Sequence, residues 1–260
     1  MAEERKVYSR TKGILPDTVS GFCPGCMHST VHKIVGEAAE ELGQLDNLVR
    51  VEGVGCCGLG QFYVSCDETI AAHGRAGAVA TGIKRSSPNS LVYTYQGDGD
   101  LAAIGLAETL SAANRGENFT VIFINNGIYG MTGGQLAPTT LVGMKSTTTP
   151  LGRKAEEHGY PLHICEIINQ LTAPYYIERV SCDTPQHVIA ARKAIKKAFQ
   201  YQLEGRGYSI IEVVTSCPTN WGLDTLSSLN FLREKMFAEY PLGVFRDRGK
   251  ETADDSSAKV

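Results

Sequence analysis

Two short motifs carry the residue types needed to hold a metal ion against a phosphate. Gly97-Asp98-Gly99 follows a strand-like segment and opens a helix, and Asn125-Asn126 closes the next strand-like segment after 25 intervening residues. Parallel neighbouring strands end at the same edge of a sheet, so a carboxylate and a carboxamide are expected side by side. Such oxygens suit Mg²⁺, and the glycines and the helix N-terminus let backbone amides approach a diphosphate. Each motif alone is typical of a turn, but their joint spacing favours a metal–diphosphate site.

Cysteine is the second residue type placed for chemistry. Cys23-Pro-Gly-Cys26 is a CxxC loop, which alone is compatible with a redox pair, half of a zinc site or half of an iron–sulfur site. A thioredoxin-like pair is expected between a strand and a helix, and only an irregular segment precedes this loop. Cys56, in a glycine-flanked turn, and Cys217, which is followed by a proline, have settings typical of cluster loops. Four thiolates from these loops suit a 4Fe–4S cluster or zinc, and spacing does not decide between the two.

The remaining cysteines and two histidines have plainer settings. Cysteines outside such loops are predicted to be small buried side chains: Cys66, Cys165 and Cys182. Cys57 either replaces Cys56 as a ligand or lines the pocket beside it. His28, near the CxxC loop, is left without a role, and His32, one turn further, is predicted to be an ordinary helix residue.

These motifs need a scaffold of alternating strands and helices. Strands are expected at 48–51, 91–95, 120–125 and 208–214, from their short apolar runs. Helices are expected at 31–42, 74–84, 101–113 and 187–203. The succession 91–95, 101–113 and 120–125 is a βαβ unit, which implies parallel strands and a right-handed crossover. The predicted fold is therefore α/β, a layered and mostly parallel sheet with helices on both faces, whose ligands lie beyond the carboxyl ends of the strands.

No repeat or low-complexity tract divides the 260 residues, and a chain of 28.1 kDa is long enough for one substantial core. We expect an N-terminal arm at 1–20, one α/β domain at 21–245 and a polar tail at 246–260. The net charge of −3 and the pI near 6.1 argue against nucleic acid as the partner, and the basic run 192–197 is interpreted as a solvated helix face.

The charged first dozen residues do not resemble a secretory leader, and the longest apolar runs are too short to cross a bilayer. A cytoplasmic, non-membrane protein is therefore expected. In that compartment eight cysteines indicate metal or cluster ligation for some of them rather than a disulfide framework.

The spacing of the first two motifs resembles the thiamine diphosphate motif, in which GDG precedes NN by a similar distance. The resemblance implies that Asp98 and Asn126 are side-chain ligands of Mg²⁺ and that the backbone carbonyl of Ile128 is a third protein ligand. Across residues 23–222 the order CPGC, VGCC, HGRA, GDGDLAAIG, NNGIYGMTGGQ and CPTNWG resembles the beta, thiamine diphosphate-binding subunit of the 2-oxoacid:ferredoxin oxidoreductases.

This second resemblance implies a 4Fe–4S cluster on Cys23, Cys26, Cys56 and Cys217. The cofactor contacts that the two resemblances imply are Gly55, Cys56, Cys57, His73, Gly74, Asp98, Gly99, Asn126, Ile128, Gly130 and Met131. The family usually has serine at the position of Cys57, so the pocket is altered there. For His73, donation from a neutral imidazole to a phosphate oxygen is favoured over a capping or surface role.

The resemblance further implies CoA-dependent oxidative decarboxylation of a 2-oxoacid, with electrons passing through the cluster to ferredoxin. After one diphosphate domain is counted, the chain has no room for an aminopyrimidine-binding domain with its activating glutamate. A separate alpha subunit is expected to supply it, with gamma and ferredoxin-like delta subunits as further partners. The alternatives are a non-redox thiamine diphosphate enzyme, which would not need the four cysteines, and a zinc-stabilised binding module in which both motifs are turns.

Substrate choice is weakly encoded. Residues 131–144 contain no lysine or arginine to pair with a distal carboxylate, and Lys145 and Arg153 are the nearest basic residues. The runs MTGGQLAPTT and PLGVF resemble the branched-chain and 2-oxoglutarate branches of the family. A 2-oxoisovalerate-type substrate is favoured, with 2-oxoglutarate or pyruvate as alternatives.

Overall fold

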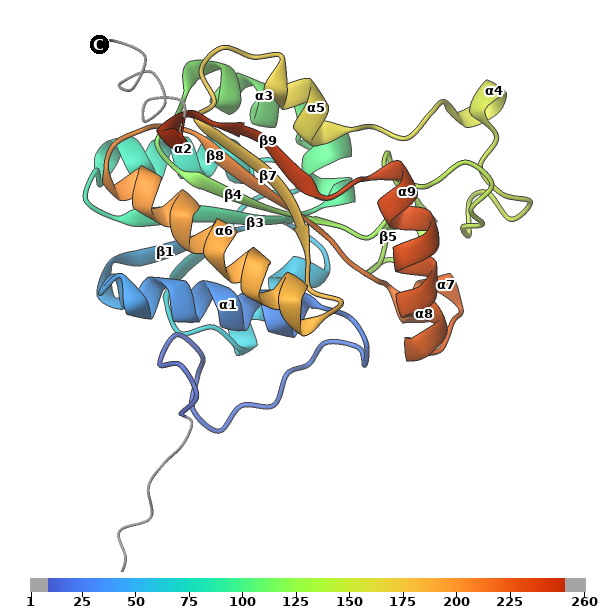
Figure 1. Ribbon diagram of the computed structural model, residues 1–260, viewed down its shortest axis with the longest axis horizontal. Helices are drawn as coiled ribbons and strands as arrows, with labels where there is room; N and C mark the ends of the chain where they lie inside the picture. Colours follow the sequence, from blue (N-terminus) through green and yellow to red (C-terminus); the bar gives the residue numbers. More distant parts are fainter. Residues whose placement is uncertain (1–8, 251–260) are drawn as a thin grey trace, which may run out of the picture.

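A seven-stranded, mostly parallel sheet forms the centre of the computed structural model, which describes residues 9–250 (Figure 1). The strands are β1 (Leu48–Glu52), β2 (Asp67–Ile70), β3 (Leu91–Gly97), β4 (Thr120–Asn125), β7 (Tyr176–Ser181), β8 (Ser209–Val214) and β9 (Gly243–Asp247). Their order is β2-β1-β3-β4-β8-β7-β9, and every neighbouring pair is parallel except β7 and β9. A separate hairpin pairs β5 (Ile128–Tyr129) with β6 (Gln135–Leu136). The predicted α/β class is therefore confirmed.

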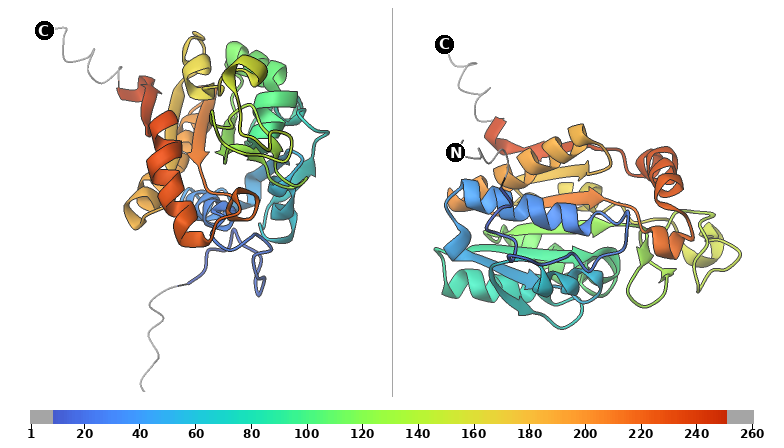
Figure 2. Two further views of the ribbon diagram at one scale, coloured as in Figure 1. Left: turned by 90° about the vertical axis from the view of Figure 1, so that its right-hand side faces the viewer. Right: turned by 90° about the horizontal axis from the view of Figure 1, so that it is seen from below.

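Helices cover both faces of this sheet (Figures 1 and 2). One face carries α1 (His28–Glu41) and α6 (Pro185–Leu203), and the other carries α2 (Ala76–Ser86), α3 (Leu106–Arg115) and α5 (Ile164–Asn169). Successive strand side chains point to opposite faces, so Tyr93 and Tyr95 pack beneath α1 and α6 while Val92 packs beneath α2 and α3. Burial on both faces explains why these strands are nearly continuous apolar runs.

The helix predicted at 101–113 is two elements. A π-helical turn, η3 (Gly99–Ile104), starts directly after Asp98, and α3 continues from Leu106. Gly105 lies at the junction, where a Cβ would come within 2.6 Å of the Gly74 carbonyl oxygen. Single π turns of this kind are frequent at functional sites.

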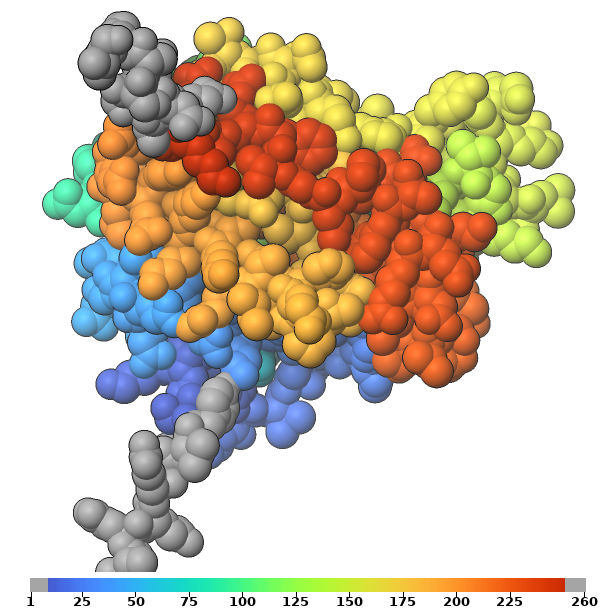
Figure 3. Space-filling model, viewed as in Figure 1, coloured from blue at the N-terminus to red at the C-terminus, as the bar shows by residue number. Residues whose placement is uncertain are grey.

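The carboxyl ends of the parallel strands meet at one edge, on the right of Figure 1. The chain passes from β1 outward to β2 and then back across β1 to β3, so its direction reverses between β1 and β3. A crevice opens outside the sheet at such a reversal. Short elements surround this edge: η2 (Cys56–Phe62), α7 (Pro218–Trp221), α8 (Thr225–Phe231), η4 (Leu232–Met236) and α9 (Phe237–Glu239). The segment with α4 (Ala155–His158) projects beyond them, as Figure 3 shows at the upper right.

The chain ends differ in part from the prediction. Residues 9–20 contain no helix, and Ile14 forms an isolated bridge with Val64. The tail was placed from residue 246, but Arg246 and Asp247 belong to β9 and pair with β7. That boundary is wrong by at least two residues because their backbones complete the sheet edge. Residues 1–8 and 251–260, with the rest of the predicted arm and tail, lie outside the described residues.

The basic run 192–197 lies on α6 and is paired with acidic neighbours. Arg192 and Lys196 contact Glu41, and Lys197 Nζ lies 2.8 Å from Asp247 Oδ2. Within residues 9–250, no helix is both long enough and apolar enough to cross a membrane.

Candidate functional site

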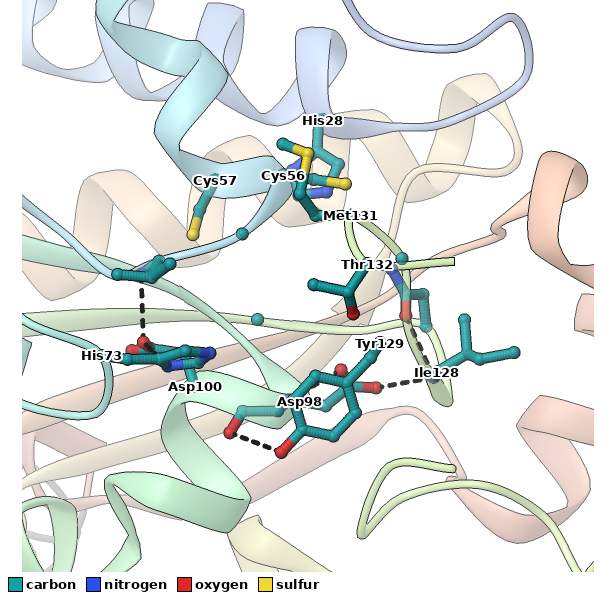
Figure 4. Close-up of a pocket in the computed structure, with 16 residues that line it drawn as sticks. His28, Cys56, Cys57, His73, Asp98, Asp100, Ile128, Tyr129, Met131 and Thr132 are labelled. Atoms are coloured by element: carbon teal, nitrogen blue, oxygen red, sulfur yellow. Dashed lines mark hydrogen bonds and ion pairs between the residues drawn. The ribbon is translucent and has the colours of Figure 1, made fainter. Parts of the chain in front are cut away.

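Loops that follow β1, β2, β3 and β4 line one pocket at the carboxyl edge of the sheet (Figure 4). All of the predicted cofactor contacts except Gly74 are among its lining residues. The pocket also includes six residues that sequence reasoning did not assign to it: His28, Val54, Gly97, Asp100, Tyr129 and Thr132. The fold therefore gathers at one place residues that lie up to 104 positions apart, from His28 to Thr132.

Asp98 and Asn126 point at the same backbone amide. The N–H of Ile128 donates to Asp98 Oδ2 at 3.0 Å and to Asn126 Oδ1 at 3.2 Å, so the carboxylate and the carboxamide lie side by side. The other carboxylate oxygen of Asp98 accepts from the N–H of Gly99 at 2.9 Å. The neighbouring strand ends thus place together the two side chains that the motif pair predicts.

Two further residues complete this corner. The hydroxyl of Thr139 donates to Asp98 Oδ2 at 2.8 Å, although Thr139 lies 41 residues along the chain. The Tyr129 ring packs so closely on Gly99 that a Cβ there would come within 2.1 Å of it, which explains the second glycine of the motif. Nothing in the plain sequence context of Thr139 indicates its role.

The carboxylate of Asp98 is almost fully buried, at 3% exposure. Burial raises the pKa of this carboxyl from 3.8 to about 6, although hydrogen bonds from Thr139, Gly99 and Ile128 act in the opposite direction. A hard divalent cation beside it would favour the ionised form. The donor set, one carboxylate and one carboxamide oxygen facing a pocket, therefore fits Mg²⁺ bound together with a diphosphate.

Four cysteines line a second pocket that adjoins the first. Cys23, Cys26, Cys56 and Cys217 surround a cavity of about 350 Å³ between the CxxC loop, η2 and α7. Both pockets share a wall of His28, Cys56, Asn126, Gly130 and Met131. The three cysteine-bearing loops predicted from the sequence are thus brought together.

Burial sets the chemistry of these thiols. It raises the pKa of Cys26 to about 12 and that of Cys56 to about 11, and the neighbouring cysteines add to both rises. A nucleophilic redox dithiol requires the opposite, a lowered pKa. The raised pKa values of Cys26 and Cys56 therefore disfavour the thioredoxin-like alternative.

Four cysteines around one cavity form a donor set for zinc or for a 4Fe–4S cluster. Within residues 9–250, no group of three or more His, Cys, Asp or Glu side chains is already arranged to hold a metal ion. In addition, Asn220 Nδ2 lies 3.3 Å from Cys217 Sγ and donates to the Gly130 carbonyl oxygen at 2.9 Å.

Cys57 points away from the other cysteines. Its thiol donates to the Gly53 carbonyl oxygen at 3.2 Å and is buried, with 2% exposure. Of these two neighbours, Cys56 lines both pockets, whereas Cys57 lines only the first. None of the three cysteines predicted to be small buried side chains lines either pocket, but only Cys165 is fully buried. Cys66 and Cys182 are half-buried, because they pack against the edge of an apolar cluster rather than inside it.

His28 and His32 are both buried on α1. His28 lines the wall between the two pockets, and its Nδ1 lies 2.9 Å from the Tyr95 hydroxyl. Burial lowers its pKa to about 4, so the ring is neutral near pH 7. His32 stacks on Tyr95 with a centroid separation of 4.1 Å and lines neither pocket.

Comparison with known proteins agrees with this geometry. Residues 53–213 match the family described as "Thiamine pyrophosphate enzyme, C-terminal TPP binding domain". Ketoisovalerate oxidoreductase subunit VorA of Methanothermobacter thermautotrophicus is 49% identical over 246 residues, which cover 95% of this chain and 51% of that subunit. The 2-oxoglutarate synthase subunit KorB of Methanocaldococcus jannaschii is 38% identical over 219 residues, covering 82% and 77% of the two chains. The chain belongs to the thiamine diphosphate-binding subunits of the 2-oxoacid:ferredoxin oxidoreductases.

A solved structure shares the fold as well. The 2-oxoglutarate:ferredoxin oxidoreductase from Magnetococcus marinus, determined with 2-oxoglutarate, coenzyme A and succinyl-CoA bound, superposes with a TM-score of 0.77 at 25% identity over 94% of this chain and 87% of that chain. Family membership and fold, as predicted from the sequence, are confirmed. The chain spans about half the length of the VorA relatives that it matches. Cys23, Cys26 and Cys217 lie outside the matched family domain.

Proposed function

We propose that this chain is the beta subunit of an enzyme that oxidatively decarboxylates a 2-oxoacid to an acyl-CoA and CO₂, passing electrons through a 4Fe–4S cluster to ferredoxin. The observation that carries the proposal is the wall shared by the two pockets. Cys56 and Gly130 border both the thiamine diphosphate pocket and the cysteine pocket. A group that loses electrons in the first pocket would thus lie next to an electron acceptor in the second. A non-redox thiamine enzyme has no use for that adjacency.

The chain's own residues hold and orient the cofactor. Thiamine diphosphate supplies the carbanion chemistry of decarboxylation when it is bound. Asp98 and Asn126 would bind Mg²⁺, and Gly97, where a Cβ would meet only open space, would let the diphosphate approach the backbone at the end of β3. Cys23, Cys26, Cys56 and Cys217 would hold the cluster.

Exposed apolar side chains at the mouth of the pocket support the proposal that a second subunit covers it. Val54 and Met131 line the pocket yet are 41% and 49% exposed, and Ile104, on η3, is 46% exposed. Apolar side chains at the rim of a polar site are typical of a surface that another subunit covers. We infer an alpha subunit that carries the aminopyrimidine-binding domain, in a permanent interface of more than about 2,000 Å². Gamma and ferredoxin-like delta subunits are further partners of the assembly.

For the substrate, a branched-chain 2-oxoacid of the 2-oxoisovalerate type is favoured. The Arg153 guanidinium, buried at 4% exposure, donates from all of its nitrogens to backbone carbonyl oxygens within residues 137–160, so it is not free to bind a distal carboxylate. Lys145 is exposed. The name of VorA, a ketoisovalerate oxidoreductase subunit, points to the same class.

The decisive experiment is anaerobic co-expression of this chain with its alpha subunit, compared with the chain alone. We expect a brown protein with four iron and four sulfide per chain, Mg²⁺-dependent thiamine diphosphate binding, and CoA-dependent ferredoxin reduction only in the complex. Rates with 2-oxoisovalerate, 2-oxoglutarate and pyruvate identify the substrate. A colourless, zinc-containing protein, or full ferredoxin reduction by the purified chain alone, would contradict the proposal.

A further inference from the structure

Asp100 is a buried carboxylate that sequence reasoning left without a role. Its side chain is 2% exposed, and its two oxygens accept several donors. Oδ1 accepts from the backbone N–H of Val54 at 3.0 Å and of Gly74 at 2.9 Å, and Oδ2 accepts from Gln96 Nε2 at 2.6 Å. The Nδ1 atom of His73 lies 2.6 Å from Oδ1, at ion-pair distance (Figure 4).

These contacts join the loops that follow three neighbouring strands. Val54 follows β1, His73 and Gly74 follow β2, and Asp100 itself follows β3. Val54, His73 and Asp100 all line the thiamine diphosphate pocket. One side chain therefore fixes the relative positions of three of the pocket-lining loops.

The backbone is shaped around this carboxylate. A Cβ on Gly53 would lie 2.3 Å from Asp100 Oδ2, and one on Gly74, which has φ +80°, would lie 2.7 Å from the backbone nitrogen of Gly105. A side chain at either position would displace the carboxylate or the loops that it holds. Gly53 is thus explained by its approach to Asp100, and Gly74 by its positive φ and its approach to the junction of η3 and α3.

The contact with Asp100 also fixes the orientation of the His73 ring. Nδ1 faces Asp100 Oδ1 at 2.6 Å, so the opposite ring nitrogen, Nε2, is turned away from the carboxylate. Because His73 also lines the pocket, Nε2 is the ring nitrogen left for a ligand there.

We propose that Asp100 is a positioning residue for thiamine diphosphate. Its carboxylate holds the loops after β1 and β2 in place and orients the His73 ring, whose Nε2 would face the diphosphate end of the cofactor. The proposal rests on the proposed function, since it requires that this pocket bind thiamine diphosphate. It does not involve the cluster or the identity of the 2-oxoacid.

The test is a double-mutant cycle on cofactor affinity. Asp100→Asn keeps an oxygen for the Val54 and Gly74 amides, and Gln96 can turn its amide to accept from the new Nδ2, so the loops stay in place while the charge beside His73 is lost. By titration calorimetry on the complex with its alpha subunit, the affinity for Mg²⁺–thiamine diphosphate should fall about 10- to 100-fold, the loss typical when an orienting partner is removed. In a His73→Gln background the same change should cost little more.

A matched control lies elsewhere in the chain. Asp183 Oδ1 is 2.5 Å from His187 Nδ1, and this second Asp–His pair lines neither pocket. Asp183→Asn should leave cofactor affinity unchanged. Gly53→Ala provides an independent perturbation, because its Cβ would displace the Asp100 carboxylate without removing it, and it should weaken binding as well.

The possible outcomes are distinct. Wild-type complex that fails to bind thiamine diphosphate refutes the proposed function. Wild-type binding with unchanged affinity in both Asp100→Asn and Gly53→Ala overturns the positioning role alone. An equal loss from Asp100→Asn with and without His73 shows that Asp100 does not act through the histidine and overturns that part of the proposal.

Discussion

Replacing Asp98 by asparagine should separate cofactor binding from folding. The structure already provides alternative partners for the groups around this carboxylate. If Nδ2 takes the place of Oδ2, the N–H of Ile128 keeps its bond to Asn126 Oδ1, and the Thr139 hydroxyl can turn to accept. The remaining oxygen still accepts from Gly99. The fold should therefore survive, while Mg²⁺ loses its one anionic side-chain ligand at this corner.

The expected change in folding stability follows from the raised pKa of Asp98 in the chain without bound metal or cofactor. Its carboxyl holds a proton to higher pH in the folded chain, about 6, than its ordinary value of 3.8. Ionisation between these values therefore destabilises the folded state as pH rises, by about 3 kcal/mol above pH 7 and about half of that at pH 5. The carboxamide that replaces it carries no such charge. Without Mg²⁺ and cofactor, the variant should be more stable than the wild type at pH 8, with the difference shrinking toward pH 4.

Two measurements check this reasoning. Thermal unfolding of the metal-free chain at pH 8 and pH 5 gives the difference in stability between variant and wild type. Calorimetry with Mg²⁺–thiamine diphosphate gives the affinity for the cofactor. This affinity should fall by more than about 100-fold, because the variant loses a metal ligand itself and not only a residue that orients a ligand. Asp183→Asn is a control for which the opposite change in stability is expected. Burial alone would raise the pKa of Asp183, but Arg233 and His187 outweigh it and hold that pKa below its ordinary value. Asp183→Asn should therefore destabilise the folded chain at pH 8. Unchanged cofactor affinity in Asp98→Asn, with normal circular dichroism, would refute the assignment.

The cluster gives three further predictions. Cys217→Ala should lose iron and sulfide while Cys182→Ala keeps both, because only the first faces the cysteine pocket; equal iron in the two variants would contradict this. By the same measurement Cys56→Ala should lose the cluster, and Cys57→Ala, whose thiol points to Gly53, should retain it. Asn220→Ala removes a hydrogen-bond donor from Cys217 Sγ. Because such hydrogen bonds stabilise the more negative, reduced cluster, the midpoint potential of the cluster should fall while the iron content stays unchanged. A potentiometric titration followed by electron paramagnetic resonance measures this shift.

Much of the site could be predicted because its residues come from short motifs tied to strand ends. Asp98 and Asn126 are adjacent in space because β3 and β4 are adjacent and parallel, and that relation follows from the helix between them. The cysteine loops were recognisable for a similar reason, since CxxC and Cys-Pro are local patterns. In each case the chemistry is encoded within a few residues.

Contacts between distant segments could not be predicted in this way. Thr139 reaches Asp98 only through the fold of the segment after β6, and the chain around it carries no motif. Strand β7 was missed because Glu178 and Arg179 interrupt its apolar pattern. Arg179 is nevertheless fully buried, since its guanidinium pairs with Glu212 of β8 at 2.8 Å and with Glu166 of α5 at 2.6 Å. A buried charge of this kind is tolerated only with its partners, and a single sequence does not reveal them.

The two pockets have a common electrostatic character. Asp98 is buried against uncharged donors that lower its pKa less than burial raises it, and the Cys26 and Cys56 thiols are shifted the same way by burial. In each group the anionic form, which would bind a cation, is therefore disfavoured by burial unless a cation neutralises its charge. Cys56 belongs to the wall between the pockets, and Asp100 Oδ1 accepts from the backbone N–H of Val54, two residues before it. A displacement of this short stretch of backbone would therefore reach both pockets.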